Sequence, residues 1–387
     1  MQIHSKEQGS VCEVIQNLTT VLVVGGGPAG SSCAWKLASA GVRCLLIDKA
    51  EFPRDKVCGG VLSSRAAGLL IKSGMISTAE LDLLTEKTHR TLSLWDREEL
   101  LRSYTSDNHP IRIISRMGFD NFLLEKAGTS GAEVITGETA VSIDSSSVRT
   151  SSNRSIRYSF IVGADGCNSF VRKTSFGRSG RKTGIGFEYI LPLSEVNDIT
   201  DGLHIHFGYL PYGYVWAFPG REKICIGAGV VGSKASPPEV ASALKEFLEA
   251  RRISAGNHVV KAALIPSLSL HKSLGTGQIY LAGDAAGLVD QVSGEGIGHA
   301  IESGFLIADA IIFGGDRKTM LIRANEGCLG SVRQSEFYRH LLFSRLTRRL
   351  AMRKLKESET FARAYWNLIS GYQSYNDMFL RLLTRSG

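Results

Sequence analysis

The chain has 387 residues, of which 43% are hydrophobic and 21% charged, and a net charge of +8. A chain of this length and composition predicts a globular protein with one large domain or two interleaved ones. The seven cysteines lack C-x-x-C or metal-ligand spacing, which favours reduced thiols over a disulfide framework. The N-terminal segment, with Lys6, Glu7 and Glu13, lacks a signal-peptide core, and no run is long enough to span a membrane. We therefore expect a cytoplasmic protein, either free or peripheral to a membrane.

The first predicted elements form a strand, a glycine turn, a helix and a second strand. The β-branched run Val21–Val24 predicts a buried parallel strand and leads directly into the motif GxGxxG. A helical pattern follows, and a second apolar run, Cys44–Ile47, ends on Asp48. This order is the dinucleotide-binding fingerprint, and its complete context makes a glycine turn in some other βαβ unit the weaker interpretation.

Each glycine of the motif has an expected task. Gly25 makes the tight turn, Gly27 lets the backbone approach a pyrophosphate, and Gly30 lets helix and strand pack closely. The N-terminus of the following helix stabilises phosphate charge. Asp48 would accept hydrogen bonds from ribose hydroxyls.

Two later segments repeat the pattern of a strand that stops at glycine and aspartate. Residues 160–169 read FIVGADGCNS, with Asp165 in a glycine loop, and residues 278–287 read QIYLAGDAAG, with Gly283 and Asp284 at the strand end. Glycines there permit a tight loop beside a cofactor, and an aspartate can reach a ribose or ribitol hydroxyl. The order and separation of the three segments favour one common nucleotide site.

Together the three segments resemble the FAD-binding skeleton of the flavoprotein hydroxylase superfamily. Three further segments, 52–60 (FPRDKVCGG), 211–219 (PYGYVWAFP) and 294–297 (GEGI), resemble the geranylgeranyl reductase family, so the likeness covers most of residues 21–310. The resemblance implies an α/β fold: a Rossmann-like, para-hydroxybenzoate hydroxylase-like FAD domain, an inserted antiparallel-sheet substrate domain and a helical C-terminal tail.

The resemblance also implies where FAD lies. Asp48 would hold the adenosine ribose, Asp284 the ribityl chain, and the segment 294–297 would lie close to the isoalloxazine ring. The implied cofactor-binding set is Gly25, Gly27, Ala29, Gly30, Asp48, Lys49, Arg54, Cys58, Gly59, Arg116, Asp165, Gly283, Asp284, Gly294, Gly296 and Ile297. Residues 288–291 read LVDQ, where a proline is commonly expected, which predicts a less rigid loop under the flavin.

Three residues are the candidates for catalysis. Cys58 follows Lys56, whose charge would partly activate the thiol, and the resemblance puts it on the substrate side of the flavin; the alternative is a small buried hydrophobe. Tyr214 and Trp216 alternate with Phe218 on one strand, so the three rings share a face. That face forms either an apolar wall opposite the flavin or part of a sheet core, and Tyr214 alone has a hydroxyl that could orient or protonate a substrate.

The remaining motifs of the sequence say less about function. His204 and His206 alternate on a strand without a third metal ligand, so we expect sheet residues and no metal site; the role of His299 stays open. Gly227-x-Gly229-x-x-Gly232 matches the dinucleotide motif again, but the prolines that follow prevent a helix from its third glycine, which favours a strand over Ile224–Val231. The electron donor, NAD(P)H or a reduced protein, would then dock without a Rossmann unit of its own.

The expected domain organisation has four parts. Residues 1–175 form the first pieces of the FAD domain, with a substrate-side excursion at about 76–104, and 270–330 form its last piece. Residues 176–269 form the antiparallel substrate domain, and 331–387 a helical region. Between Arg339 and Lys356, cations alternate with leucines in a pattern that predicts one basic amphipathic helix. It would bind a membrane surface or an acidic carrier protein, or simply pack on the body of the protein, which we favour; nothing indicates nucleic-acid binding.

The resemblance implies an FAD-dependent oxidoreductase that reduces carbon–carbon double bonds of a polyprenyl chain by hydride transfer from the flavin. A dehydrogenase or desaturase running the same step backwards fits equally. The alternatives are a flavin monooxygenase acting on a hydrophobic or aromatic metabolite and a non-catalytic electron-transfer flavoprotein docked on a partner. The stretch Tyr214–Pro219 departs from the Trp-x-Trp-x-Ile-Pro segment of flavin halogenases, which disfavours halogenation.

Overall fold

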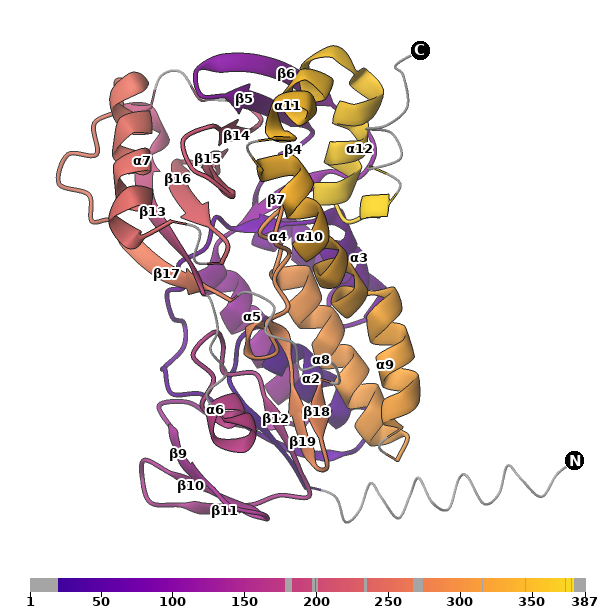
Figure 1. Ribbon diagram of the computed structural model, residues 1–387. Coiled ribbons are helices and arrows are strands. Elements are labelled where there is room, and N and C mark those ends of the chain that lie inside the picture. The colour runs from indigo at the N-terminus through magenta and orange to yellow at the C-terminus, as the bar shows by residue number, and fades with distance from the viewer. Residues whose placement is uncertain are drawn as a thin grey trace, which may run out of the picture.

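The computed structural model describes residues 20–177, 183–196, 199, 201–232, 235–266, 274–314, 316–344, 346–372, 374–376 and 378. The N-terminal segment with Lys6, Glu7 and Glu13 therefore lies outside the described residues, as does Arg345. Figure 1 shows two main sheets, one above the other, with most of the C-terminal helices packed at the upper right.

A mostly parallel six-stranded sheet carries the glycine-rich turn. Its strand order is β18-β19-β12-β1-β2-β8, and all neighbours are parallel except the pair β18–β19. The strands are β1 (Thr20–Val24), β2 (Arg43–Ile47), β8 (Glu133–Ile135), β12 (Phe160–Gly163), β18 (Gly275–Thr276) and β19 (Ile279–Leu281). Because β1 is buried on both faces, its apolar run is continuous rather than alternating, as the sequence predicts.

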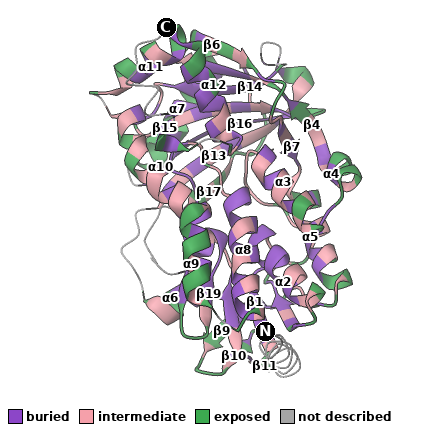
Figure 2. Cartoon of the chain, turned by 90° about the vertical axis from the view of Figure 1, so that its right-hand side faces the viewer, coloured by how far each residue is buried: buried purple, intermediate pink, exposed green. Residues whose placement is uncertain are grey.

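Helices α2 (Pro28–Ser39), α5 (Arg116–Thr129) and α8 (Ile297–Ile312) pack against this sheet. α2 and α8 approach at backbone distance, since a Cβ on Gly304 would lie 2.4 Å from the carbonyl oxygen of Ala29. α8 is almost entirely buried, whereas α9 (Arg317–Glu326) shows exposed residues on its outer side (Figure 2). The close contact packs the first turn of α2 against the middle of α8.

A seven-stranded sheet forms the second body of the molecule. Its order is β17-β13-β16-β15-β14-β5-β6, antiparallel throughout except where β14 pairs with β5. The strands are β5 (Thr91–Asp96), β6 (Glu99–Thr105), β13 (Gly184–Pro192), β14 (Leu203–Phe207), β15 (Gly213–Pro219), β16 (Lys223–Val230) and β17 (Lys261–Ile265). β5 and β6 lie at residues 91–105, far from the other strands in the chain, so this sheet draws on two separated parts of the sequence. Helix α7 (Pro237–Ala250) covers one face through Val240, Leu244 and Phe247.

The C-terminal region is helical, but the predicted single basic helix is wrong. α10 (Cys328–Phe343) ends before Ser344, and α11 (Arg348–Glu357) begins after Thr347. The Ser344 and Thr347 hydroxyls bond each other at 2.7 Å, and Ser344 Oγ accepts the Thr347 N–H at 3.4 Å. Such local side-chain bonds compete with the helical backbone, which explains the interruption.

α11 and α12 (Glu359–Ile369) pack on the seven-stranded sheet. Buried side chains of these helices share one core with strands β5 and β14, including Met352, Leu355 and Trp366. Arg348 pairs with Asp96 and Lys356 with Glu99, so basic side chains of α11 face acids of β5 and β6. Leu346, between α10 and α11, is 93% exposed.

Smaller elements complete the fold. β3 (Val61–Leu62), β7 (Ile111–Ile114) and β4 (Thr85–His89) form one three-stranded sheet, and β9 (Ala140–Ile143), β10 (Ser147–Thr150) and β11 (Ser155–Arg157) another. The remaining helices are α3 (Ser64–Ser73), α4 (Thr78–Leu84), α6 (Phe170–Phe176) and the 3₁₀ turns η1 (Leu193–Glu195) and η2 (Gly283–Ala285).

Candidate functional site

The glycines of the fingerprint differ in what requires them. A Cβ on Gly25, which has φ +111°, would lie 2.3 Å from the carbonyl oxygen of Ala164, and a Cβ on Gly30 would lie 1.8 Å from that of Gly25. Packing within the chain therefore demands both. Among the residues that the structure describes, a Cβ on Gly27 would meet only Arg54 Nη2, at 3.4 Å. The space beside Gly27 is open, as the close approach of a bound pyrophosphate requires.

Two helix N-termini near this space are suited to an anion. α2 begins at Gly27 and α8 at Gly296, and neither N-cap has a side-chain hydrogen bond or an acidic residue in the first turn. Gly283 lies between them, because a Cβ there would stand 3.1 Å from the Cβ atoms of both Ala29 and Ala300. Free backbone N–H groups and two positive dipole ends fit the phosphates of a dinucleotide.

Asp48 lies at the carboxyl end of β2, where the sequence predicts it. Its carboxylate accepts the Gly26 N–H at 2.6 Å and the Ala50 N–H at 2.8 Å, so it is held rigidly beside the glycine turn. The neighbouring Lys49 is exposed. Further acceptor capacity on the Asp48 oxygens suits ribose hydroxyls.

Arg54 and Arg116 converge on one buried carboxylate. Arg116 bonds Asp120 in a bidentate pair at 2.8 and 2.7 Å, and Arg54 Nη2 lies 3.2 Å from the same carboxylate. Burial alone would lower the pKa of Arg116, but the charge of Asp120 raises it above its ordinary value. Arg54, which also lies over the ring of Phe52, thus brings a cation to the open space beside Gly27.

Asp165 has a structural task in addition to any contact with a cofactor. Its Oδ2 accepts the N–H groups of Phe170 at 2.5 Å and Val171 at 3.1 Å, which fixes the start of α6. Its Oδ1 is buried, and no partner for it is found among the described residues. Burial raises the pKa of this carboxyl.

The loop between η2 and α8 lacks the expected proline, and hydrogen bonds to a buried aspartate hold it instead. Asp290 accepts the N–H groups of Val292 at 2.9 Å and Ser293 at 2.8 Å, and the Tyr375 hydroxyl at 2.5 Å. The Gln291 N–H also donates to Ser335 Oγ at 2.8 Å. A buried carboxylate therefore organises the loop in place of a proline ring. The two ends of the loop lie close together, since a Cβ on Gly296 would stand 3.7 Å from Asp284 Oδ1.

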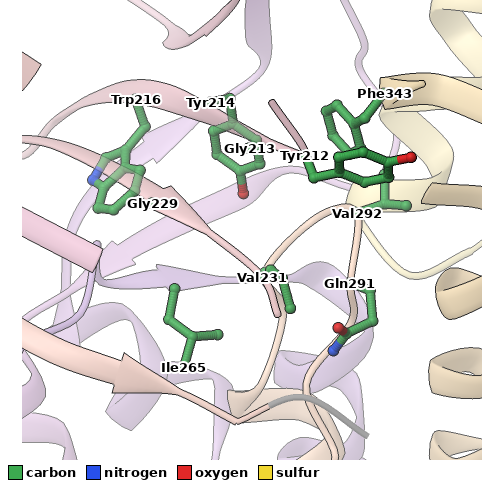
Figure 3. A pocket seen from close by; sticks show the side chains of 11 residues that line it. Tyr212, Gly213, Tyr214, Trp216, Gly229, Val231, Ile265, Gln291, Val292 and Phe343 are labelled. Carbon is green, nitrogen blue, oxygen red and sulfur yellow. The ribbon is translucent and has the colours of Figure 1, made fainter. Parts of the chain in front are cut away.

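A cavity lies between this loop and the seven-stranded sheet (Figure 3). The space it offers, open solvent included, is about 300 Å³, and Tyr214, Trp216, Ile265, Val292 and Phe343 are among the side chains that line it. Trp216 stacks on Phe218 with centroids 6.3 Å apart, and the Tyr214 ring stands edge-on to Trp216 at 6.2 Å. Phe218 continues the aromatic face toward Gly59, where a Cβ would stand 3.0 Å from its ring.

Tyr214 joins the aromatic face to the predicted flavin loop. Its hydroxyl donates to the carbonyl oxygen of Ser293 at 2.6 Å, and a Cβ on Gly294 would stand 3.1 Å from that hydroxyl. Burial raises the pKa of Tyr214, which keeps the hydroxyl protonated. The aromatic strand and the segment 293–297 therefore meet in one site.

Comparisons with known protein families agree with this geometry. A model of the FAD binding domain matches residues 18–207, and the geranylgeranyl reductase catalytic domain matches residues 185–264. Geranylgeranyl diphosphate reductase from the chloroplast of Oryza sativa is 30% identical over 338 residues, covering 79% of this chain and 69% of that protein. The chain belongs to the geranylgeranyl reductase family of FAD-dependent oxidoreductases.

Other relatives of this family member carry different names. The menaquinone reductase of Mycobacterium tuberculosis is 29% identical and covers 77% of both chains. A crystal structure of a geranylgeranyl bacteriochlorophyll reductase-like protein from Thermoplasma acidophilum superposes with a TM-score of 0.73, 22% identity and coverage of 94% and 98%. A probable FAD-dependent monooxygenase from Pseudomonas aeruginosa superposes with a TM-score of 0.68 at 19% identity, covering 88% of this chain and all (100%) of that one. The two superpositions confirm the fold, which reductases and oxygenases share.

The second glycine motif of the chain, Gly227-x-Gly229-x-x-Gly232, supports the ring of Trp216. A Cβ on Gly227 would lie 2.3 Å from Trp216 Cζ2, and one on Gly229 would lie 3.2 Å from Trp216 Cζ3. The indole thus lies flat on the backbone of β16, which explains both glycines. The predicted strand over Ile224–Val231 is confirmed as β16, so the motif is not a second dinucleotide turn.

Sequence reasoning missed Glu188 on β13, which lies beside the candidate residue Cys58. Its side chain is buried, and its Oε1 accepts the Cys58 N–H at 2.9 Å. Cys58 is half-buried and its thiol also contacts Arg116, so Cys58 lies where the FAD domain meets the sheet. The only sequence signal for Glu188 is a lone carboxylate in an apolar strand.

His204, His206 and His299 pack in the interior. His206 stacks on Trp95 at 5.2 Å, and His204 stacks on the same ring at 6.1 Å. His299 is buried in α8, with Arg65, Asp290 and Glu302 as its charged neighbours. Over the part of the chain that the structure describes, no group of three potential ligands could hold a metal, and no helix is long and apolar enough to cross a membrane.

Proposed function

We propose that this protein reduces carbon–carbon double bonds in the polyprenyl chain of a hydrophobic substrate. The observation that carries the proposal is the aromatic cavity of Tyr214 and Trp216, which opens directly onto the segment 291–294 beside the N-terminus of α8. An apolar cavity with few polar groups suits a hydrocarbon chain. Family membership supports the same reaction class.

The chain's own residues would bind the cofactor, position the substrate and exclude water. The uncapped N-termini of α2 and α8 would hold the FAD phosphates and the ring end, and Asp48 and Asp284 the ribose and ribityl hydroxyls. Reduced FAD supplies a hydride when bound. Trp216 and Phe218 would hold the alkene in a dry pocket, and Tyr214 Oη, which keeps its proton, would orient the chain.

Anaerobic turnover tests the proposal. The holoenzyme is reduced with dithionite, mixed with geranylgeranyl diphosphate without oxygen, and followed by flavin absorbance and product mass. Reoxidation, with a gain of two hydrogens per bond, is expected. Flavin that stays reduced until air enters contradicts the proposal and favours an oxygenase, whereas conversion of the saturated chain to an alkene by oxidised enzyme favours a desaturase.

A panel of substrates would then separate the members of the family. Relatives are named for geranylgeranyl diphosphate, menaquinone and digeranylgeranylglycerophospholipid, so these three compounds form the panel. The electron donor is proposed to be NAD(P)H or a reduced protein. Anaerobic bleaching by NADPH or NADH alone supports the nicotinamide, and bleaching only with a reduced carrier supports the protein donor.

Docking on a membrane surface or an acidic carrier protein is proposed for the region around Leu346, α10 and α11. The exposed leucine and the exposed Arg349 support it, while the ion pairs of Arg348 and Lys356 with the sheet oppose it. Sedimentation with anionic vesicles, compared between the wild type and Leu346→Asp, decides whether this region binds lipid.

A further inference from the structure

Glu188 is a buried carboxylate that bonds the candidate catalytic residue Cys58 directly and is linked to another, Trp216, through Cys225. It is 3% exposed and lies between the segment 55–60 and strand β16. Its Oε1 accepts the Cys58 N–H at 2.9 Å, and the Cys225 thiol donates to its Oε2 at 3.6 Å. One carboxylate therefore joins a loop of the FAD domain to the sheet that forms the substrate cavity.

The connection continues to the aromatic wall. Trp216 Nε1 donates to Cys225 Sγ at 3.4 Å, so the indole is linked to Glu188 through one thiol. The loop also touches the wall directly, since a Cβ on Gly59 would stand 3.5 Å from Trp216 Nε1. A change at Glu188 therefore alters the contacts both of Cys58 and of the Trp216 ring that lines the cavity.

We infer that Glu188 is a positioning residue, whose carboxylate holds the Cys58 segment and the Trp216 ring in the one relative arrangement that turnover needs. This inference rests on the proposed function. Glu188 acts through Cys58 and Cys225 and is not itself placed against the substrate.

The arrangement depends on the charge of Glu188. An ionised carboxylate accepts from both the Cys58 N–H and the Cys225 S–H. Burial raises the pKa of Cys225, so this thiol stays protonated and donates. A protonated Glu188 must instead donate one bond, and Cys225 Sγ would then receive two donors, from Glu188 and Trp216. Protonation therefore weakens the contact that fixes the indole.

The surroundings move the titration of Glu188 upward. Burial, the largest cause, raises its pKa, and the Asp55 charge also raises it. The Cys58 N–H, the Cys225 thiol and the charge of Lys261 act in the opposite direction, and Lys261 is itself paired with Asp55. The ionised form is lost as pH falls through the raised pKa, so kcat/KM has an acid limb above the pKa of about 4.3 of an exposed glutamate.

Glu188→Gln tests the inference, because the amide copies the protonated state. The readouts are FAD affinity by titration of apoprotein, and kcat/KM for geranylgeranyl diphosphate with dithionite-reduced holoenzyme over about pH 5 to 9. We expect unchanged FAD affinity, kcat/KM lowered about 10- to 100-fold at neutral pH, and no acid limb. Glu222→Gln, an exposed glutamate next to β16, is the matched control and should keep the wild-type profile. A Glu188→Gln enzyme with full kcat/KM and the wild-type limb overturns the inference.

A second pair of variants decides the matter should Glu188→Gln fail to fold. Cys225→Ser keeps a group that donates to Glu188 and accepts from Trp216, whereas Cys225→Ala removes it. Retained kcat/KM in the serine variant with loss in the alanine variant supports the inference, and equal rates in both overturn it.

Tryptophan fluorescence separates this inference from the proposed function. If the wild type reduces none of the three polyprenyl compounds of the panel, the proposed function fails, but the link between Glu188 and Trp216 is still measurable. Emission should change across the titration of Glu188 in the wild type and lose that change in both Glu188→Gln and Trp216→Phe. A change that persists in Glu188→Gln overturns the link.

Discussion

Gly27 and Gly30 belong to the same motif but differ in what a side chain would encounter. Gly27 has φ −75° and ψ −177°, an extended conformation open to any residue, and its Cβ position is free of backbone. We expect Gly27→Val to fold and yet to purify without FAD, because the valine fills the pyrophosphate space. Absorbance of the purified protein, with its melting temperature, measures both effects.

Gly30→Ala is the contrasting variant. Its Cβ would stand 1.8 Å from the Gly25 carbonyl oxygen, so the helix and turn must shift. Overpacking of this kind costs about 1–3 kcal/mol, which should lower the melting temperature of the apoprotein. A yellow Gly27→Val protein, or a stable Gly30→Ala apoprotein that binds FAD normally, would contradict this assignment of the two glycines.

A substitution at Trp216 tests whether this ring forms part of the wall of the substrate cavity. Trp216→Ala removes the largest aromatic surface that lines the cavity while leaving the glycine turn intact. Losing burial worth about 1.5–3 kcal/mol should raise KM for geranylgeranyl diphosphate about 10- to 100-fold, with FAD retained. Trp35→Phe, in α2 and outside the cavity, is the control. An unchanged KM in Trp216→Ala would return the aromatic strand to a purely structural role.

At the scale of elements, the C-terminal region holds the loop 288–296 in place. The Tyr375 hydroxyl bonds Asp290, and the Asp290 carboxylate organises the loop beneath the predicted flavin ring. Tyr375→Phe should lower the free energy of unfolding by about 1.5–3 kcal/mol and weaken FAD binding, since it deprives a buried carboxylate of a donor. Chemical denaturation and titration with FAD measure the two effects.

The neighbouring Tyr338 supplies the control for this prediction. Its ring stacks on Tyr375 at 5.6 Å, but its hydroxyl bonds Asn376 at the surface. Tyr338→Phe should change the stability by no more than about 0.5 kcal/mol. Equal losses in the two variants would show that ring packing, rather than the bond to Asp290, holds the loop.

What the sequence predicts at this scale depends on how local the cause is. The strand–turn–helix unit at Val21–Ser39 is set by residues within a few turns, and it is confirmed. The helix expected between Arg339 and Lys356 is wrong because Ser344 and Thr347 bond each other locally, an effect that an amphipathic pattern does not register. Glu188 was missed because Cys58 lies 130 positions away along the chain.

On the scale of the whole molecule, the site exists only where separated segments meet. The FAD-domain loop at Cys58, the sheet strands β13 and β15, and the C-terminal Tyr375 each come from a different part of the chain. The same assembly buries histidines as neutral groups. Folding and proton binding are therefore linked over the whole protein.

His206 provides the clearest test of the coupling between folding and proton binding. Burial is the main reason that its pKa falls to about 3, although its bond to the Arg97 carbonyl oxygen acts in the opposite direction. Below about pH 6.5 the unfolded chain binds a proton at this position and the folded protein does not, so stability is lost as pH falls. The expected slope is about 1.4 kcal/mol per pH unit for this one group.

The prediction is tested as a difference between wild type and His206→Gln, whose amide can still donate to Arg97. Asp165, Glu188 and Asp290 have raised pKa values, so they take up protons more readily in the folded than in the unfolded state, which stabilises the folded state as pH falls. Because their contribution is the same in both proteins, it cancels in the difference. Urea unfolding between about pH 7 and 5 should show a shallower loss of stability in His206→Gln, by about 2 kcal/mol at the acid end. Parallel curves would mean that His206 titrates alike in the folded and unfolded chains, and that the interior of the seven-stranded sheet admits water.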